Sequence, residues 1–260
     1  MLRKMSVLPG FLTATFVMAA FLYAPCAMAQ EAARQNPPPY RGVQTHVDGV
    51  FVTPVPNAPL TAVAEVQSTQ VLDDGSSVSK KTFNRIARDS QGRIYNERRA
   101  LVPESFDGEP PVISMHIYDP TTKLNTFLEV DTRLARQSVR LETAPTLALA
   151  QSRPSVVPVN RPGYQEQDLG TESMENVVVH GVRKIRTIPA TASGTGKPIV
   201  VTDEYWYSEE LHLNMLVKHD DPRTGQQTVA ITQVNRSEPP PATFEIPGDY
   251  KIVDETPVPR

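Results

Sequence analysis

Two short strings in the sequence have residue types and a spacing that could carry chemistry. Residues 77–80 (Ser-Val-Ser-Lys) match the spacing of a nucleophilic serine and its activating lysine, and residues 194–197 (Gly-Thr-Gly-Lys) resemble the end of a phosphate-binding loop. The first string begins an alternating, strand-like segment where such enzymes place a helix, and it lacks their Ser-Asp-Asn and Lys-Thr-Gly companions. In the second, Pro198 replaces the Ser or Thr that would coordinate a metal. Neither string therefore predicts an active site.

The histidines and carboxylates show no catalytic or metal-binding spacing either. No two of the five histidines are close enough in sequence to share a metal and the only cysteine is Cys26, so the sequence predicts no metal site and no cofactor. His212 and His219 are expected on opposite faces of a strand, in solvent. Acids such as Glu204 and Glu209 form no pair with catalytic spacing, so we expect no catalytic residue and no enzyme. A hydrolase assembled from distant carboxylates stays open as an alternative.

Residues 1–29 have the pattern of a secretion signal. Two basic residues precede an uncharged apolar run at 11–23, and Ala27 and Ala29 occupy the small-residue positions of a signal-peptidase site. We therefore expect cleavage after Ala29 and a periplasmic or secreted protein. Two alternatives stay open. The run could be kept as a membrane anchor, although it is shorter than the roughly 20 apolar residues of a spanning helix, or Cys26 could carry a lipid, against which the proline before it argues.

Removal of this leader changes the charge and the thiol content of the chain. The net charge moves from −3 to −5, because 24 of the 26 basic residues and all 29 acidic residues remain. A mildly acidic chain without a block of basic residues has little attraction for nucleic acid or for anionic membrane surfaces. Because the only cysteine lies in the leader, disulfides and thiolate chemistry are excluded from the mature protein. Its stability must then come from buried apolar area.

The prolines divide the mature chain. Six of them fall within residues 30–61, where they remove backbone donors and fix φ, so we interpret this stretch as an extended arm. A second proline-rich segment, residues 142–166, contains a Leu-Ala-Leu-Ala string that forms either a helical turn or two or part of an irregular loop. We predict a single β-rich domain at 62–255, interrupted by this insertion, and a short tail at 256–260.

Between the interruptions, apolar residues alternate with the period of half-buried strands, as in the run Leu211, Leu213, Met215 and Val217. Turn sequences such as Asp-Asp-Gly at 73–75 separate these runs, and helical periodicity is scarce. Short strands joined by tight turns predict a mainly β, antiparallel meander that curls into an open barrel or sandwich. The strands are expected at 62–72, 77–88, 93–102, 112–118, 124–130, 134–140, 168–174, 177–188, 198–208, 211–219 and 226–235.

The C-terminal part carries the most specific pattern. Residues 204–208 (Glu-Tyr-Trp-Tyr-Ser) lead into an alternating strand, a turn follows at 221–225, and a Pro-x4-Phe-x-Ile-Pro-x2-Tyr segment runs from Pro239 to Tyr250. This order resembles the ending of the lipoprotein-carrier and lipoprotein-receptor (LolA/LolB-like) superfamily of the bacterial envelope, which includes an RseB-like periplasmic sensor that binds an anti-sigma factor. It also resembles uncharacterised exported β-rich bacterial proteins.

This resemblance implies a fold and a class of function. It implies a curved antiparallel sheet that forms an open, incomplete barrel with few short helices, and an apolar concave face that takes acyl chains or a partner segment. The chain departs from the carriers in having little helix-forming sequence to close the barrel. The matched positions are structural, so the resemblance transfers no ligand-binding residue.

Candidate residues for the concave wall come from the alternating strands. Tyr205 and Trp206 point to opposite faces of one strand, and large aromatics bury about 150 to 250 Å² each, so one face is expected in a core or cavity wall. Phe244, Ile246 and Tyr250 are expected to fold back and latch the last strand. The candidate ligand-binding residues, which could equally form plain core, are Ile113, Met115, Ile117, Tyr205, Trp206, Leu213, Met215 and Val217.

Together these features favour a non-catalytic binding or scaffold protein of the envelope that desolvates an apolar ligand or partner segment in a concave site. Its partner would be a lipid, a lipoprotein or another envelope protein, not nucleic acid, and no integral membrane span would remain after cleavage. Two alternatives stay open. One is a periplasmic sensor or regulator that captures a partner strand at the sheet edge or the proline arm, and the other is the hydrolase of dispersed carboxylates.

Overall fold

The computed structural model describes residues 52–72, 74–139 and 160–257 of the chain. All described residues belong to one unit of the chain, Gly42–Arg260. The expected signal peptide, most of the proline-rich arm and the Leu-Ala-Leu-Ala string lie outside the described residues. The domain boundaries and the cleavage site therefore stay predictions.

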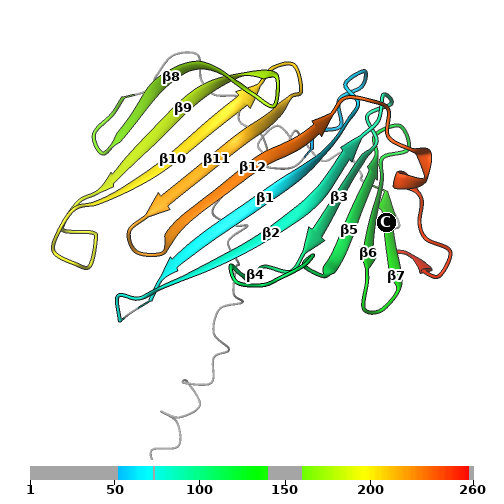
Figure 1. Ribbon diagram of the computed structural model, residues 1–260, viewed down its shortest axis with the longest axis horizontal. Coiled ribbons are helices and arrows are strands. Elements are labelled where there is room, and N and C mark those ends of the chain that lie inside the picture. The colour runs from blue at the N-terminus through cyan, green and yellow to red at the C-terminus, as the bar shows by residue number, and fades with distance from the viewer. Residues whose placement is uncertain (1–51, 73, 140–159, 258–260) are drawn as a thin grey trace, which may run out of the picture. The chain divides into compact units, whose positions relative to one another are not determined.

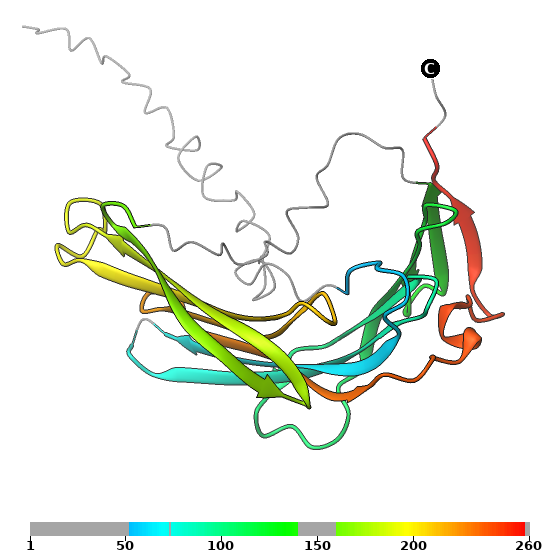
Figure 2. The same ribbon diagram turned by 90° about the horizontal axis from the view of Figure 1, so that it is seen from above.

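The described part of this unit contains strands and one short 3₁₀ helix: β1 (Leu60–Val71), β2 (Ser77–Arg88), β3 (Ile94–Arg99), β4 (Val102–Pro103), β5 (Val112–Asp119), β6 (Leu124–Glu129), β7 (Leu134–Val139), β8 (Tyr164–Met174), β9 (Val177–Ile188), β10 (Ile199–Ser208), β11 (Leu213–Asp221), β12 (Gly225–Asn235), η4 (Pro241–Phe244) and β13 (Lys251–Asp254). All strands belong to one sheet, in the order β13-β7-β6-β5-β3-β2-β1-β12-β11-β10-β9-β8, with β4 paired to β2 off this path. The sheet bends into an arc and does not close (Figures 1 and 2). With 59% strand and 2% helix, the predicted mainly β fold with an open curved sheet and few short helices is confirmed. Within the described ranges, no helix has the length and apolar character that crossing a membrane requires.

Most neighbours in the sheet are antiparallel, and many are consecutive along the chain. Two contacts join strands that are far apart in the sequence. β1 pairs antiparallel with β12, which brings the first strand and the last long strand of the described chain together in the middle of the sheet (Figure 1). β13 runs parallel to β7 at one edge.

The sequence of β1 shows why a strand in this position forms. Residues that point to one side, Leu60, Ala62, Ala64 and Val66, are buried, whereas those between them are more exposed. This period of two matches the pleat of a sheet with one covered face. The β11–β12 turn depends on Gly225, whose φ is 105° and where a Cβ atom would lie 1.9 Å from the carbonyl oxygen of Thr69. Only glycine fits this close approach to β1.

The strands lie close to the positions expected from alternation and turn residues, with informative differences. The expected strand at 93–102 is divided into β3 and β4, because its register with β5 shifts between Arg98 and Arg99. β11 begins at Leu213 because His212 has a φ of 50° and belongs to the turn before it. The sequence did not indicate β13, which is too short to show an alternation.

A smaller core lies on the outer, convex side of the sheet, along which the segment after β12 runs (Figure 2). The predicted folding back of Phe244, Ile246 and Tyr250 is confirmed, but their predicted contact with the last long strand is wrong. The outer face of β12 carries Thr228 and Thr232 and offers little apolar surface. The segment instead covers apolar residues of β2, β5, β6 and β7, namely Ala87, Ile117, Leu128 and Ala135.

Candidate binding surface on the concave side of the sheet

The convex core is the reference for deciding which side chains face the opposite, concave side of the sheet. Ala87 of β2 belongs to that core, and alternate residues of a strand point to opposite faces, so Ile86 and Thr82 point to the concave side. Thr82 lies opposite Val66 in the uninterrupted register between β1 and β2. Following the register from Val66 then identifies the concave residues of β12, β11 and β10.

An apolar row crosses four neighbouring strands on this side. The register pairs Val66 with Val229, Val229 with Val217, and Val217 with Tyr205. The three valines are at most 7% exposed, and Tyr205 packs against the same core. Because neighbouring strands lie about 4.8 Å apart, the row spans roughly 14 Å. It is therefore a continuous apolar track, which we call the apolar row.

A polar row runs beside it on the same four strands. Asp203 lies opposite His219, His219 opposite Gln227, and Gln227 opposite Ser68. The Oδ1 atom of Asp203 lies 2.6 Å from Nδ1 of His219, and this hydrogen bond raises the pKa of His219 although burial opposes the shift. The expectation that His219 lies in solvent is wrong, because its carboxylate partner compensates for burial.

Five of the eight candidate wall residues come from β10 and β11, and they lie on both faces. Tyr205 and Val217 belong to the apolar row, and Leu213 and Met215 are fully buried in the same larger core. Trp206 belongs to this core as well, and because it follows Tyr205 in the strand its side chain leaves the opposite face of β10. Whether the concave members contact a ligand stays a prediction.

The other three candidates lie away from this surface. Ile117 belongs to the convex core and Met115 packs against it, so the C-terminal segment covers them. Ile113, near the start of β5, is 43% exposed. Alternation puts Met115 and Ile117 on one strand face, whereas the register of β5 with β3 shifts at Ile113. Alternation could not show which side of the sheet that face occupies.

Trp206 also belongs to a polar cluster around Glu204. Its Nε1 donates to Oε1 of Glu204 at 2.8 Å, and Arg183 and Lys218 donate to the same carboxylate at 2.8 and 3.2 Å. Burial acts to raise the pKa of Glu204, but these hydrogen bonds outweigh it and the pKa is lowered. The indole ring lies over Gly181 of β9, where a Cβ atom would come within 2.7 Å of it. The tryptophan is thus a buried structural residue whose indole packs against Gly181 and donates to Glu204.

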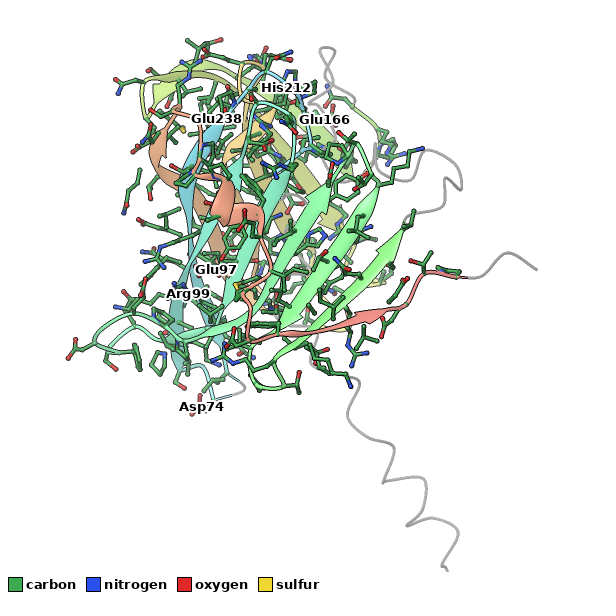
Figure 3. The ribbon with its side chains drawn as sticks, turned by 90° about the vertical axis from the view of Figure 1, so that its right-hand side faces the viewer. Asp74, Glu97, Arg99, Glu166, His212 and Glu238 are labelled. Carbon is green, nitrogen blue, oxygen red and sulfur yellow. The ribbon has the colours of Figure 1, made fainter. Side chains whose placement is uncertain are left out.

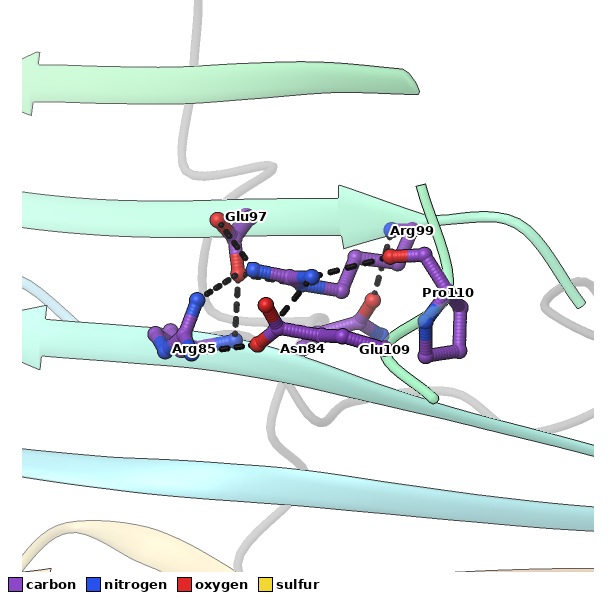
Figure 4. A network of polar contacts seen from close by, with 6 residues as sticks. All are labelled: Asn84, Arg85, Glu97, Arg99, Glu109 and Pro110. Atoms are coloured by element: carbon purple, nitrogen blue, oxygen red, sulfur yellow. Dashed lines mark hydrogen bonds and ion pairs between the residues drawn. The ribbon is translucent and has the colours of Figure 1, made fainter. Parts of the chain in front are cut away.

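A second polar cluster, on the convex side, surrounds Glu97 and Arg99 of β3 (Figures 3 and 4). Nε of Arg99 donates to Oε2 of Glu97 at 2.7 Å, and its Nη1 donates to the carbonyl oxygen of Pro110 at 2.8 Å. Arg85 of β2 forms ion pairs with Glu97 and with Glu109. The cluster joins the segment before β5 to β2 and β3, and its carboxylates are held by guanidinium groups.

Sequence reasoning missed Arg88, which is fully buried at the end of β2. Its Nε donates to the carbonyl oxygen of Ala58 at 2.6 Å and its Nη1 to that of Thr53 at 2.9 Å. Burial lowers the pKa of Arg88 to about 10. An arginine at a strand end is ordinarily solvated, so its burial was not expected from the sequence. The only signal for burial is that Arg88 directly follows the apolar residues Ile86 and Ala87.

Comparison with known proteins gives likeness of structure only. No protein-family model and no curated protein matches the chain. A conserved protein from Thermus thermophilus superimposes with a TM-score of 0.39 and 9% identity, over 76% of this chain and 91% of that one. The MucA/MucB complex of Pseudomonas aeruginosa gives 0.36 and 11%, over 75% and 58%. A LolA superfamily protein from Nitrosomonas europaea gives 0.30 and 9%, over 74% and 91%. The similar structures thus include the superfamily that the C-terminal pattern resembles.

Proposed function

We propose that this chain is an exported, non-catalytic binding protein of the bacterial cell envelope. The concave side of its sheet holds an apolar ligand, such as an acyl chain, or the apolar side of a partner segment. Binding proceeds by desolvation of apolar surface.

The apolar row carries this proposal. Four strands contribute one apolar side chain each, in register, to the same face. Removal of a valine-sized side chain from water stabilises an apolar contact by roughly 1.5 to 3 kcal/mol. The valines are buried in the structure, so a ligand binds there by replacing the protein atoms that contact them. An extended apolar chain has the shape needed to replace those protein atoms along the apolar row.

The state of the buried carboxylates supports a non-catalytic role. Glu97, Glu204 and Asp221 each accept hydrogen bonds from a nearby arginine. A carboxylic acid that works as a proton donor needs a pKa raised towards the operating pH. The hydrogen bond from Arg223 lowers the pKa of Asp221, and the pKa of Glu204 is lowered as well. Both groups are therefore arranged as permanent anions.

The alternative of a regulator that captures a partner strand at the sheet edge has less support. β8 is the outermost strand at one edge of the described sheet. It carries Glu166, Asp168 and Glu172, and its register with β9 shifts before Gly170. Acidic residues and a bulge are features that discourage further strand pairing.

Native mass spectrometry of protein isolated from the periplasm tests the proposal. Retained lipid is the expected result, whereas a co-purifying polypeptide indicates the regulator. The variant Val66→Thr places a hydroxyl in the apolar row and should reduce lipid occupancy. Val63→Thr on the other face of β1 is the matched control and should retain it. Absence of lipid in the wild type, together with failure to bind an added acyl ligand, contradicts the proposal.

A further inference from the structure

Two buried polar groups on the concave side of the sheet have no hydrogen-bond partner in the described structure. On the convex side, the charged side chains of Glu97 and Arg99 are paired with each other, although the hydroxyl of Tyr250 is buried without a hydrogen-bond partner. On the concave side, Oγ1 of Thr82 and Oε1 of Gln227 are buried without any partner. Thr82 is 3% exposed and Gln227 is 5% exposed. Native proteins leave few such groups, because an unpaired buried polar group costs stability.

Both unpaired groups lie next to the apolar row. Thr82 is opposite Val66 and ends the row on β2, and Gln227 is two residues from Val229 on β12. Since only β1 separates β12 from β2, their strands are roughly 10 Å apart. Ser68 of β1 lies opposite Gln227, between the two strands. The unpaired groups thus flank one end of an apolar track whose other end is Tyr205.

The hydrogen-bonding capacity of this end, and not its charge, selects the head group. Asp203 and His219 are already paired with each other, and Lys80 lies opposite Ser68 on the same face. Oε1 of Gln227 is an acceptor, so the group that satisfies it must supply a hydrogen-bond donor. A carboxylate supplies none, whereas a hydroxyl or an amide does.

We propose that the ligand is an amphiphile with a neutral head that carries hydroxyl or amide donors. The head lies over β12, β1 and β2 and pairs with Gln227 and Thr82, and its acyl chain follows the apolar row towards Tyr205. This inference rests on the proposed function, because it assigns the class of ligand to the same surface.

Titration of the mature protein with oleoyl compounds that differ only in their heads tests this inference. Monooleoylglycerol supplies hydroxyl groups, oleamide supplies an amide, and oleate supplies a carboxylate, each used below its aggregation concentration. We expect at least one neutral compound to bind roughly tenfold more tightly than oleate, since it satisfies one or two buried groups. The tighter of the two neutral compounds identifies the donor as a hydroxyl or an amide.

Variants identify the groups responsible. Gln227→Met should reduce the preference for the neutral head about fivefold, and Thr82→Val should act in the same direction. Gln67→Met, on the outer face of β1, is the matched control and should leave the preference unchanged. The melting temperature of ligand-free Gln227→Met and Thr82→Val should equal or exceed that of the wild type, because neither variant breaks a hydrogen bond.

The outcomes separate this inference from the proposed function. Equal affinity for all three compounds contradicts the proposed neutral head group, and so does a preference that is unchanged in both Gln227→Met and Thr82→Val. In either case the proposed apolar binding site is still supported by binding of the oleoyl chain. A lower melting temperature in both variants shows that the two groups are bonded within the protein and also contradicts the inference. Failure of all three compounds to bind contradicts the proposed function itself.

Discussion

Nη2 of Arg88 donates to the carbonyl oxygen of Leu211 at 2.9 Å, although the two residues are 123 positions apart in the sequence. With its bonds to Thr53 and Ala58, this one buried side chain satisfies three carbonyl oxygens. It thereby fixes the segment before β1 and the turn between β10 and β11 to the end of β2. A neutral side chain at this position leaves all three acceptors without their donor.

The variant Arg88→Met should therefore lower the free energy of unfolding by about 3 kcal/mol, since each lost hydrogen bond contributes about 1 kcal/mol. Urea denaturation of the protein measures this difference. Arg98→Met removes an exposed arginine from β3 and should change stability by less than about 0.5 kcal/mol. Equal stabilities of the two variants would show that the Arg88 bonds contribute nothing.

The contact between Gly181 and Trp206 predicts an effect that fluorescence can follow. Gly181→Ala places a Cβ atom within 2.7 Å of the indole ring, and the ring must move. We expect a loss of about 1 to 3 kcal/mol of stability and a shift in emission from Trp206, which is the only tryptophan. Gly248→Ala meets no atom within 4 Å and serves as the control. An unchanged emission spectrum in Gly181→Ala contradicts this contact.

The strands were predictable because their signals are local. Alternation over Leu124–Glu129 and a turn sequence beginning at Asp119 suffice to indicate β6 and its hairpin with β5. The curvature of the sheet and its failure to close were predicted from the family resemblance. The burial of Arg88 was not predictable, because the carbonyl oxygens that accept its hydrogen bonds come from segments far from it in the sequence.

The candidate site was predicted only in part. Tyr205 and Val217 were among the candidates, but their row partners Val66 and Val229 were not. These partners join the row through the pairing of β1 with β12, which depends on long-range register. Ile117 was assigned to the same wall although it faces the convex core. Strand alternation shows which residues share a face, and only the arrangement of strands shows which face is concave.

His219 predicts a specific pH dependence. Because the bond to Asp203 raises the pKa of His219 above 6.5, its stabilising contribution is complete below that pH and is lost as pH rises through the folded-state pKa. The stability difference between wild type and His219→Gln should be largest near about pH 6 and should narrow towards about pH 8. Denaturant unfolding across this range measures it.

His116 provides a control of opposite sign for that measurement. Burial lowers the pKa of His116 although Asn125 is within hydrogen-bond distance, so its contribution is present above pH 6.5 and is lost as pH falls. The difference between wild type and His116→Gln should therefore narrow towards about pH 5. If both variants show the same direction of pH dependence, the assignment of the Asp203 bond is wrong.

Phe244 tests the attachment of the C-terminal segment to the convex core. Its ring is buried, and the Arg93 guanidinium lies 4.8 Å from its centroid. Phe244→Ala removes a buried aromatic side chain and should cost about 3 to 5 kcal/mol, measured as a fall in unfolding free energy. Phe106→Ala, at a more exposed phenylalanine, is the matched control and should cost much less. A melting temperature of Phe244→Ala equal to that of the wild type would mean that this segment does not stabilise the sheet.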